Sequence, residues 1–193
     1  MVWKVKFFLL MGVLCALFMA PEASFAGKTE AQKALKEAEG KIYYTAVNIW
    51  YEDPKDILST NYHKGRLLPI NTQVKIGTIR KSGITFTDND NMAYMIKIVI
   101  KHTPNTLEDV FNNYFSESQI SLLSLNGEEK RNVEAGTIGV GMSKKAVIAA
   151  YGYPPAHMTP SLESNQWKYW KDRFRNFFVF FNNEGNVIRI GRE

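Results

Sequence analysis

The sequence predicts an α+β protein in which a β-rich N-terminal region precedes helices packed on a C-terminal three-stranded antiparallel sheet. Apolar and polar residues alternate over much of 41–104, as they do in half-buried strands. Apolar residues recur at helical spacing from Thr106 to Ser118. Near the end, three strand-like runs follow a short helix, and Asn182 to Gly185 have the composition of a tight turn. Together these observations indicate separate β and α+β regions.

The first 26 residues have the layout of a secretory signal peptide. Lys4 and Lys6 precede an apolar run over 7–19, and small residues follow up to Ala26. That run is too short to predict a membrane span. We therefore expect an exported protein, periplasmic or secreted, that is cleaved near Ala26.

Cys15 is the only cysteine, and it lies inside the apolar run. Leu14 precedes it where a lipidation signal needs a small residue, so we expect no lipid anchor. Removing residues 1–26 takes away two lysines and one glutamate, and the net charge falls from +5 to +4. Lysine and arginine form no run and no helical stripe, so the sequence predicts no nucleic-acid partner.

Residues 27–40 are rich in alanine, lysine and glutamate, which predicts a spacer or a frayed helix. Residues 41–104 predict a β-rich region that resembles a small SH3-like barrel, by analogy only. A solvated hairpin turn is expected at 88–91. The predicted strands of this region cover 42–51, 57–62, 67–76, 83–87 and 93–100.

The α+β region is expected to cover 105–193, with its core at 136–190. It opens with an amphipathic helix from Thr106, a residue suited to an N-cap with Asp109 three positions on. Residues 119–135 are more polar and are expected to be a linker. A second helix starts after Ser143 and stops at Gly152, before two prolines. The last three strands are predicted at 167–174, 177–181 and 186–190.

The C-terminal third resembles the SmpA/OmlA (BamE-like) family. The resemblance is carried by motifs in a fixed order: Gly139-x-Gly141-Met142-Ser143-Lys144, Val147, Gly152-x-Pro154, Trp167-x-Tyr169, and Phe181 before Gly185-x-Val187. It implies a non-enzymatic binding module of the kind that assists outer-membrane assembly, with a fold like that of β-lactamase-inhibitor protein. Most members of that family are lipoproteins, and their domain is most of the chain, whereas here a long segment precedes it.

No motif in the sequence predicts catalysis, a cofactor or a metal site. His63, His102 and His157 are widely separated and lack the spacing of a zinc site. Residues 88–91 lack the glycine and glutamate of a calcium-binding loop. The glycines between 136 and 141 lack the lysine of a phosphate-binding loop, which leaves a tight approach to the next helix as their expected role.

The last strands carry more apolar surface than one helix layer can cover. The run from Phe177 to Phe181 is apolar on both faces, while Trp167 and Tyr169 point one way and Trp170 the other. The second face needs the N-terminal region, a partner or lipid to cover it. Tryptophan, tyrosine and arginine are common in binding hot spots. The candidate partner-binding residues are Tyr153, Pro154, Pro155, Trp167, Tyr169, Trp170 and Arg173.

We therefore expect an exported, non-enzymatic bacterial envelope protein that binds another envelope protein through its C-terminal sheet. The outer-membrane surface and peptidoglycan are the other partners left open. One alternative is a cell-wall binding module, which an exposed aromatic groove between Tyr43 and Tyr94 would favour. A second is an enzyme inhibitor, which a protruding loop over 155–165 would favour. A third is an enzyme, which would need a pocket in which titratable groups converge.

Overall fold

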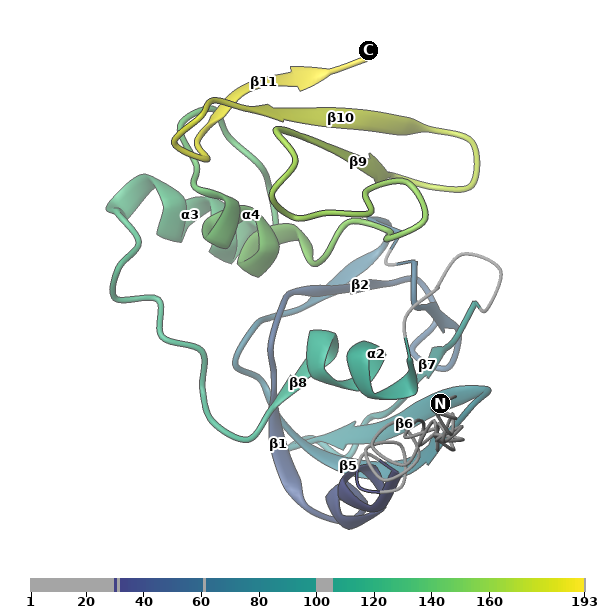
Figure 1. Ribbon diagram of the computed structural model, residues 1–193. Coiled ribbons are helices and arrows are strands. Elements are labelled where there is room, and N and C mark those ends of the chain that lie inside the picture. Colours follow the sequence, from purple (N-terminus) through teal and green to yellow (C-terminus); the bar gives the residue numbers. More distant parts are fainter. Residues whose placement is uncertain (1–29, 31, 61, 100–105, 193) are drawn as a thin grey trace, which may run out of the picture.

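The computed structural model describes residues 30, 32–60, 62–99 and 106–192 of the 193-residue chain. The expected signal peptide, Cys15 and His102 lie outside these described residues. The protein is α+β: a curled six-stranded sheet is followed by helices and a C-terminal three-stranded sheet (Figure 1). Within the described ranges, no helix has the length and apolar character needed to cross a membrane.

The N-terminal sheet has the strand order β3-β7-β6-β5-β1-β8. All neighbouring strands are antiparallel except β3 and β7. A separate two-stranded sheet pairs β2 with β4. The bounds are β1 Ile42–Thr45, β2 Ile49–Tyr51, β3 Ile57–Leu58, β4 Arg66–Leu68, β5 Gln73–Arg80, β6 Gly83–Asp88, β7 Ala93–Lys97 and β8 Phe115–Ser116.

Two predicted strands are each divided in the structure. The run expected over 42–51 breaks between β1 and β2, and the run expected over 67–76 breaks between β4 and β5. The second break is a turn in which Asn71 adopts a φ of 64°. Hydrogen bonds from side chains hold both breaks together, because Thr45 Oγ1 accepts from Thr72 N–H and Asn48 Oδ1 accepts from Ile70 N–H. Apolar patterning alone does not reveal such bonds.

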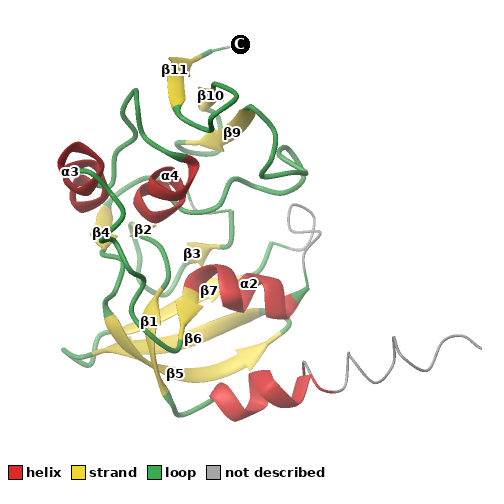
Figure 2. Cartoon of the chain, turned by 60° about the vertical axis from the view of Figure 1, so that its left-hand side comes forward, coloured by secondary structure: helices red, strands yellow, loops and turns green. Residues whose placement is uncertain are grey.

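The helix α2 (Leu107–Tyr114) packs inside the curl of the six-stranded sheet (Figure 2). Its capping box forms as expected, because Thr106 Oγ1 accepts from Asp109 N–H and Asp109 accepts from Thr106 N–H. Val110, Phe111 and Tyr114 are buried. The predicted helix ends four residues early, because Phe115 and Ser116 pair with β1 as β8.

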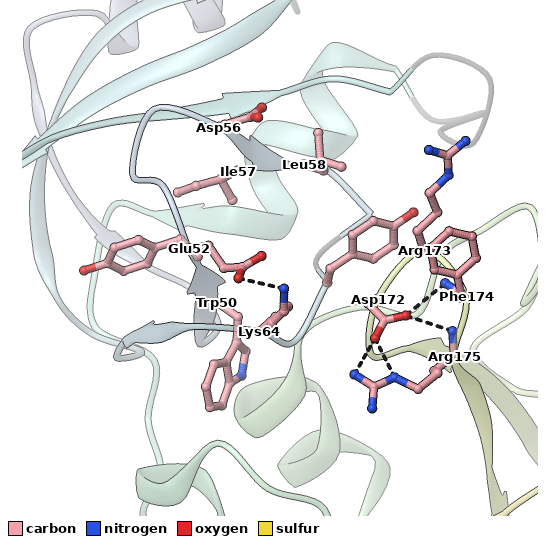
Figure 3. A pocket seen from close by; sticks show the side chains of 12 residues that line it. Trp50, Glu52, Asp56, Ile57, Leu58, Lys64, Asp172, Arg173, Phe174 and Arg175 are labelled. Atoms are coloured by element: carbon pink, nitrogen blue, oxygen red, sulfur yellow. Dashed lines mark hydrogen bonds and ion pairs between the residues drawn. The ribbon is translucent and has the colours of Figure 1, made fainter.

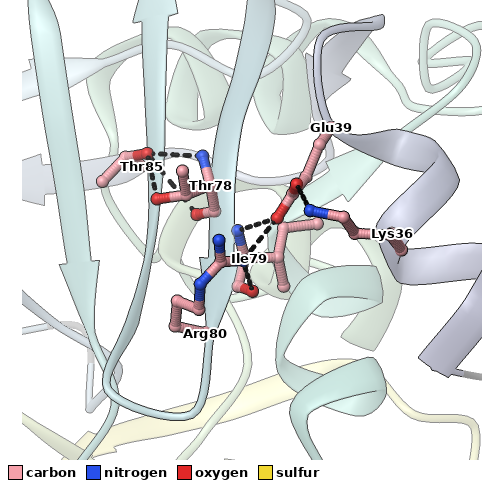
Figure 4. Close-up of polar contacts among 6 residues, drawn as sticks. All are labelled: Lys36, Glu39, Thr78, Ile79, Arg80 and Thr85. Carbon is pink, nitrogen blue, oxygen red and sulfur yellow. Dashed lines mark hydrogen bonds and ion pairs between the residues drawn. The ribbon is translucent and has the colours of Figure 1, made fainter.

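A helix over 32–38 forms part of the N-terminal core, because Leu35 and Ala38 are buried there. The Glu39 carboxylate holds this helix against β5 (Figure 4). It accepts hydrogen bonds from Ile79 N–H at 2.9 Å and from Arg80 Nη1 at 2.7 Å. The bond from Ile79, together with that from Lys36, lowers the pKa of Glu39 to about 2. The predicted spacer therefore ends in an anchored helix.

The C-terminal half combines two helices with the order β11-β10-β9. Ser143 caps the second helix as expected, and the turn over Asn182–Gly185 joins the last two strands. The linker expected over 119–135 contains a helix that the sequence analysis missed, α3. The bounds are α3 Gly127–Ala135, α4 Lys144–Tyr151, β9 Gln166–Trp170, β10 Asn176–Phe181 and β11 Val187–Gly191.

Buried residues from α3, α4 and one face of the three strands form a second hydrophobic cluster, distinct from the N-terminal one. The Glu129 carboxylate joins the two helices, because it accepts from Asn126 N–H at the start of α3 and from Ser143 N–H and Oγ before α4. Burial acts to raise the pKa of Glu129, but the hydrogen bonds from Ser143 and Asn126 outweigh it and the pKa is lowered.

The polar side chains of Asn48 and His63 connect the two halves of the molecule. Asn48 is 1% exposed, and its amide donates to Val133 O at 2.6 Å and Ala150 O at 3.0 Å. His63 lies stacked on Tyr151, with Nε2 2.6 Å from Tyr151 O and Nδ1 3.3 Å from Trp170 O. Burial lowers the pKa of His63 to about 4, although the two carbonyls act in the opposite direction. The two halves are therefore held in a fixed relation.

Candidate functional site

The three C-terminal strands have one buried face and one face turned away from the rest of the molecule (Figure 1). Trp167, Tyr169, Phe177, Val179 and Phe181 occupy the buried face. The opposite face carries the intervening residues of the same strands. We call this the outer face and define it by Lys168, Trp170, Phe178, Phe180 and Arg189.

The outer face alternates aromatic rings with cations. The Arg189 guanidinium lies 3.6 Å from the centre of the Phe180 ring, which is opposite it in register. Lys168 Nζ lies 5.1 Å from the Phe178 ring and 5.3 Å from the Trp170 ring. The rings of Phe178 and Phe180 are 6.1 Å apart. A cation over an aromatic face is attracted by the ring quadrupole. Here the cations lie over the three rings, which are half-buried.

The loop between β9 and β10 extends this surface with more aromatic and cationic groups (Figure 3). Phe174 is 83% exposed, and the Arg173 guanidinium lies 5.7 Å from its ring. Asp172 shapes the loop by accepting from Phe174 N–H, Arg175 N–H and Arg175 Nε. The bond from Phe174, followed by that from the Arg175 side chain, lowers the pKa of the Asp172 carboxyl.

A groove of about 610 Å³ separates this loop from the N-terminal half (Figure 3). Its lining residues include Tyr51 and Tyr62 from the N-terminal half and Arg173 and Phe174 from the loop. Several of its charged groups are already paired, as Lys64 Nζ lies 2.8 Å from Glu52 and Arg175 pairs with Asp172. The groove therefore offers aromatic surface next to the outer face rather than a converging set of free charged groups.

The structure places the seven predicted site residues in different environments. Pro154 and Pro155 are buried, and Tyr153 is half-buried against the N-terminal core. Trp170 lies on the outer face, and Arg173 is exposed in the loop.

Trp167 and Tyr169 are 0% and 1% exposed. Tyr169 Oη donates to Gly152 O at 2.9 Å, and burial raises its pKa. Both residues therefore act as core residues and offer no surface to a partner.

Sequence reasoning did not single out Lys168, Phe178, Phe180 or Arg189. Two features of the sequence did point to Phe178 and Phe180. The run from Phe177 to Phe181 is apolar on both faces, and strand alternation puts its even-numbered members on the face of Trp170.

The observations named for the first two alternatives have different outcomes. Tyr43 and Tyr94 are 7% and 4% exposed, so they form no exposed groove. The loop over 155–165 is exposed over most of its length, with Met158 and Leu162 among its exposed apolar side chains. It is fixed at Thr159, whose Oγ1 accepts from Lys168 N–H of β9.

Among the described residues, no group of three or more histidine, cysteine, aspartate or glutamate side chains could hold a metal ion. No family model, no curated protein and no solved structure matches the chain.

Proposed function

We propose that this protein is an exported, non-enzymatic envelope protein that binds another envelope protein through the outer face of its C-terminal sheet. One observation carries the proposal. The three strands bury one face against α3 and α4, yet their other face displays Trp170, Phe178 and Phe180 with two cations. Sheet faces that stay in water usually carry polar side chains, whereas aromatic residues and arginine are enriched where proteins bind.

The adjoining loop supports the same proposal. Phe174 adds a large exposed ring, and Arg173 and Trp170 are residue types that dominate binding hot spots. We propose in addition that the C-terminal half, in which helices cover one face of the sheet, is similar to the SmpA/OmlA family. We also propose that the curled N-terminal sheet is similar to SH3-like barrels.

The test is capture of a partner from envelope extract by immobilised residues 27–193. We expect a specific protein to be retained by the parent chain and lost with Trp170→Ala or Arg173→Ala. Lys75→Ala is the matched control, because Lys75 is an exposed cation on the N-terminal sheet. A partner retained equally by all three variants would place the binding site elsewhere.

Export has its own test. The proposal expects the mature chain to begin near residue 27, because the signal-like segment ends at Ala26. N-terminal sequencing of protein recovered from the periplasm measures this directly. A periplasmic chain that still begins at Met1 contradicts cleavage, and a chain retained in the cytoplasm contradicts export.

The exposed loop over 155–165 supports one second candidate, an inhibitor that inserts this loop into an enzyme. Met158 and Leu162 are 41% and 38% exposed, and the loop is anchored at its middle by Thr159. Under this candidate, Met158→Ala and Leu162→Ala abolish capture while Trp170→Ala leaves it intact. Under the leading proposal, the pattern is reversed.

A further inference from the structure

A second groove, of about 490 Å³, lies where the two halves of the molecule meet. This volume is in the range of pockets that hold small molecules. Residues of α4, β8, the segment that joins β8 to α3, and the loop over 155–165 line it (Figure 1). We call it the seam groove. Its lining is mostly apolar and includes Phe115, Ile120, Leu122, Ile148, Leu162 and Trp167.

The charged residues that line the seam groove are Lys144, Lys145 and Glu163. Lys144 Nζ donates to Leu162 O at 2.8 Å, and Lys145 Nζ donates to Ser124 Oγ at 3.1 Å. Within the described part of the chain, none of the three charged residues forms an ion pair. A lysine ammonium can donate several hydrogen bonds. Both lysines therefore keep donors and positive charge available to an anion.

Both lysines occupy the first turn of α4, where no residue is acidic. The start of a helix carries partial positive charge, so it favours anions and disfavours cations. A carboxylate bound beside Lys144 and Lys145 offsets this unfavourable arrangement. The local field of α4 and the two side chains thus favour the same kind of ligand group.

The seam groove also has a buried donor. Trp167 is 0% exposed, and its indole N–H has no acceptor among the residues that the structure describes. Buried polar groups usually have a hydrogen-bond partner, so an unpaired one calls for an explanation. Lys144 Nζ lies 5.6 Å from the centre of the same indole ring. The free ammonium protons and the unpaired N–H therefore belong to one corner of the groove.

These features limit what can occupy the seam groove. The corner at Lys144 and Trp167 needs a negatively charged acceptor, and the remaining lining needs an apolar body. Burial of that body supplies affinity, and the charged group fixes its orientation. The carboxylate of Glu163 disfavours ligands that carry more than one negative charge, such as phosphate monoesters. A single carboxylate on an apolar body matches all of these conditions.

We infer that the seam groove binds a fatty acid of medium chain length. The fatty-acid carboxylate accepts hydrogen bonds from Lys144 and Lys145 beside the indole of Trp167. Its alkyl chain packs on Ile148 and Leu162. This small-molecule site lies apart from the outer face and goes beyond the proposed function.

The test is calorimetric titration of the purified protein with decanoate, kept below the concentration at which it forms micelles. Two matched ligands divide the contributions. Butyrate keeps the carboxylate and loses most of the apolar contact, and decyltrimethylammonium keeps the chain and reverses the charge. We expect each to bind about tenfold more weakly than decanoate, or weaker still. Equal affinity for decanoate and either matched ligand overturns the inference, as does the absence of decanoate binding.

Variants and NMR spectra localise the ligand. Lys144→Gln should weaken decanoate binding about tenfold, because it removes a charge-assisted hydrogen bond. Lys75→Gln, the same change on the N-terminal sheet, should leave it unchanged. If Lys144→Gln does not fold, Lys145→Gln tests the same corner. Equal affinity of the groove variant and Lys75→Gln overturns the inference.

The indole N–H signals provide an independent readout. The signal of Trp167 should shift on titration with decanoate, while those of Trp50 and Trp170 should stay in place. Shifts confined to Trp50 or Trp170 place the ligand outside the seam groove and overturn the inference.

The outer face provides the separation from the proposed function. Trp170→Ala should abolish capture of the protein partner and leave decanoate affinity unchanged. Decanoate binding that depends on Lys144 supports the seam groove even if no partner is captured. A Trp170-dependent partner without decanoate binding keeps the outer face as a site and refutes the fatty-acid site.

Discussion

Each of the two large sheets packs one face into a hydrophobic core and leaves the other face open. The two open faces carry different side chains. The curled N-terminal sheet shows Lys75, Thr85, Thr87 and Lys97 outward, with Ile42 and Met95 as the apolar residues paired with them. The C-terminal sheet shows Trp170, Phe178 and Phe180 under two cations. The first pattern suits contact with water, and the second suits contact with a partner. This difference within one chain is the strongest indication of where function lies.

The sheets also differ at their edges. The six-stranded sheet ends in β3 and β8, which have two residues each. Very short edge strands offer little template for pairing with another chain. The C-terminal sheet ends in the five-residue β11. The open face and the open edge therefore occur in the same sheet.

The largest expected effect concerns the covered face of the N-terminal sheet. Phe111 is 4% exposed, and its ring packs against those of Tyr43 and Phe115. Phe111→Ala should lower the free energy of unfolding by about 3–5 kcal/mol, because it leaves a cavity under the sheet. Urea denaturation measures the loss. An unchanged midpoint would mean that α2 is peripheral, and that this sheet has two open faces.

The next effect concerns the joint between the two halves of the molecule, by which we mean Asn48 and His63 with their hydrogen bonds. Asn48→Ala removes the partner of Val133 O, Ala150 O and Ile70 N–H in a buried site. Unsatisfied buried groups of this kind cost about 1–3 kcal/mol each, so we expect a loss of about 3 kcal/mol in total. Asn112→Ala, at an exposed position of α2, is the control. A similar loss in both variants would show that the joint contributes no special stability.

The joint should also make stability depend on pH. The pKa of His63 is about 4 in the folded chain, below its ordinary value of 6.5, because of burial. Between these values the unfolded chain binds a proton that the folded chain does not. Stability is therefore complete above pH 6.5 and falls as the pH drops toward 4, by up to about 3 kcal/mol.

Denaturation series at several pH values, compared between the parent and His63→Gln, isolate this contribution from that of the carboxylates. Between pH 4 and 6.5, the free energy of unfolding should fall less steeply with decreasing pH in His63→Gln than in the parent. Parallel pH profiles for the two proteins would mean that the pKa of His63 is the same in the folded and unfolded chains, which contradicts the prediction.

Local signals in the sequence predicted much of this fold. Ser143 and Thr106 mark helix starts, and strand alternation separates Trp167 and Tyr169 from Trp170 correctly. Alternation does not say which face a helix covers, so residues of both faces entered the predicted site.

The missed helix α3 has a capping box of its own, formed by Asn126 and Glu129, but only Val133 as a large buried apolar residue. Its place depends on the Glu129 bonds to Ser143, fourteen residues away. Contacts of this range are invisible to local patterns, as are the Asn48 bonds that divide the first predicted strand.

The smallest effect on stability should accompany the largest effect on binding. Phe178→Thr with Phe180→Thr gives the C-terminal sheet the threonine character of the N-terminal outer face. Both rings are half-buried against each other and beneath cations, so each change should cost only about 1 kcal/mol. Melting curves and circular dichroism check that the fold is kept.

Partner affinity should respond far more strongly in the same double variant. A hot-spot side chain contributes about 2 kcal/mol or more, which corresponds to a loss of roughly thirtyfold in affinity. Thr87→Ala on the N-terminal sheet is the matched control and should change nothing. If the double variant folds normally and binds the recovered partner as tightly as the parent, then aromatic residues on an open sheet face are not the binding determinant. The exposed loop over 155–165 would then become the leading site.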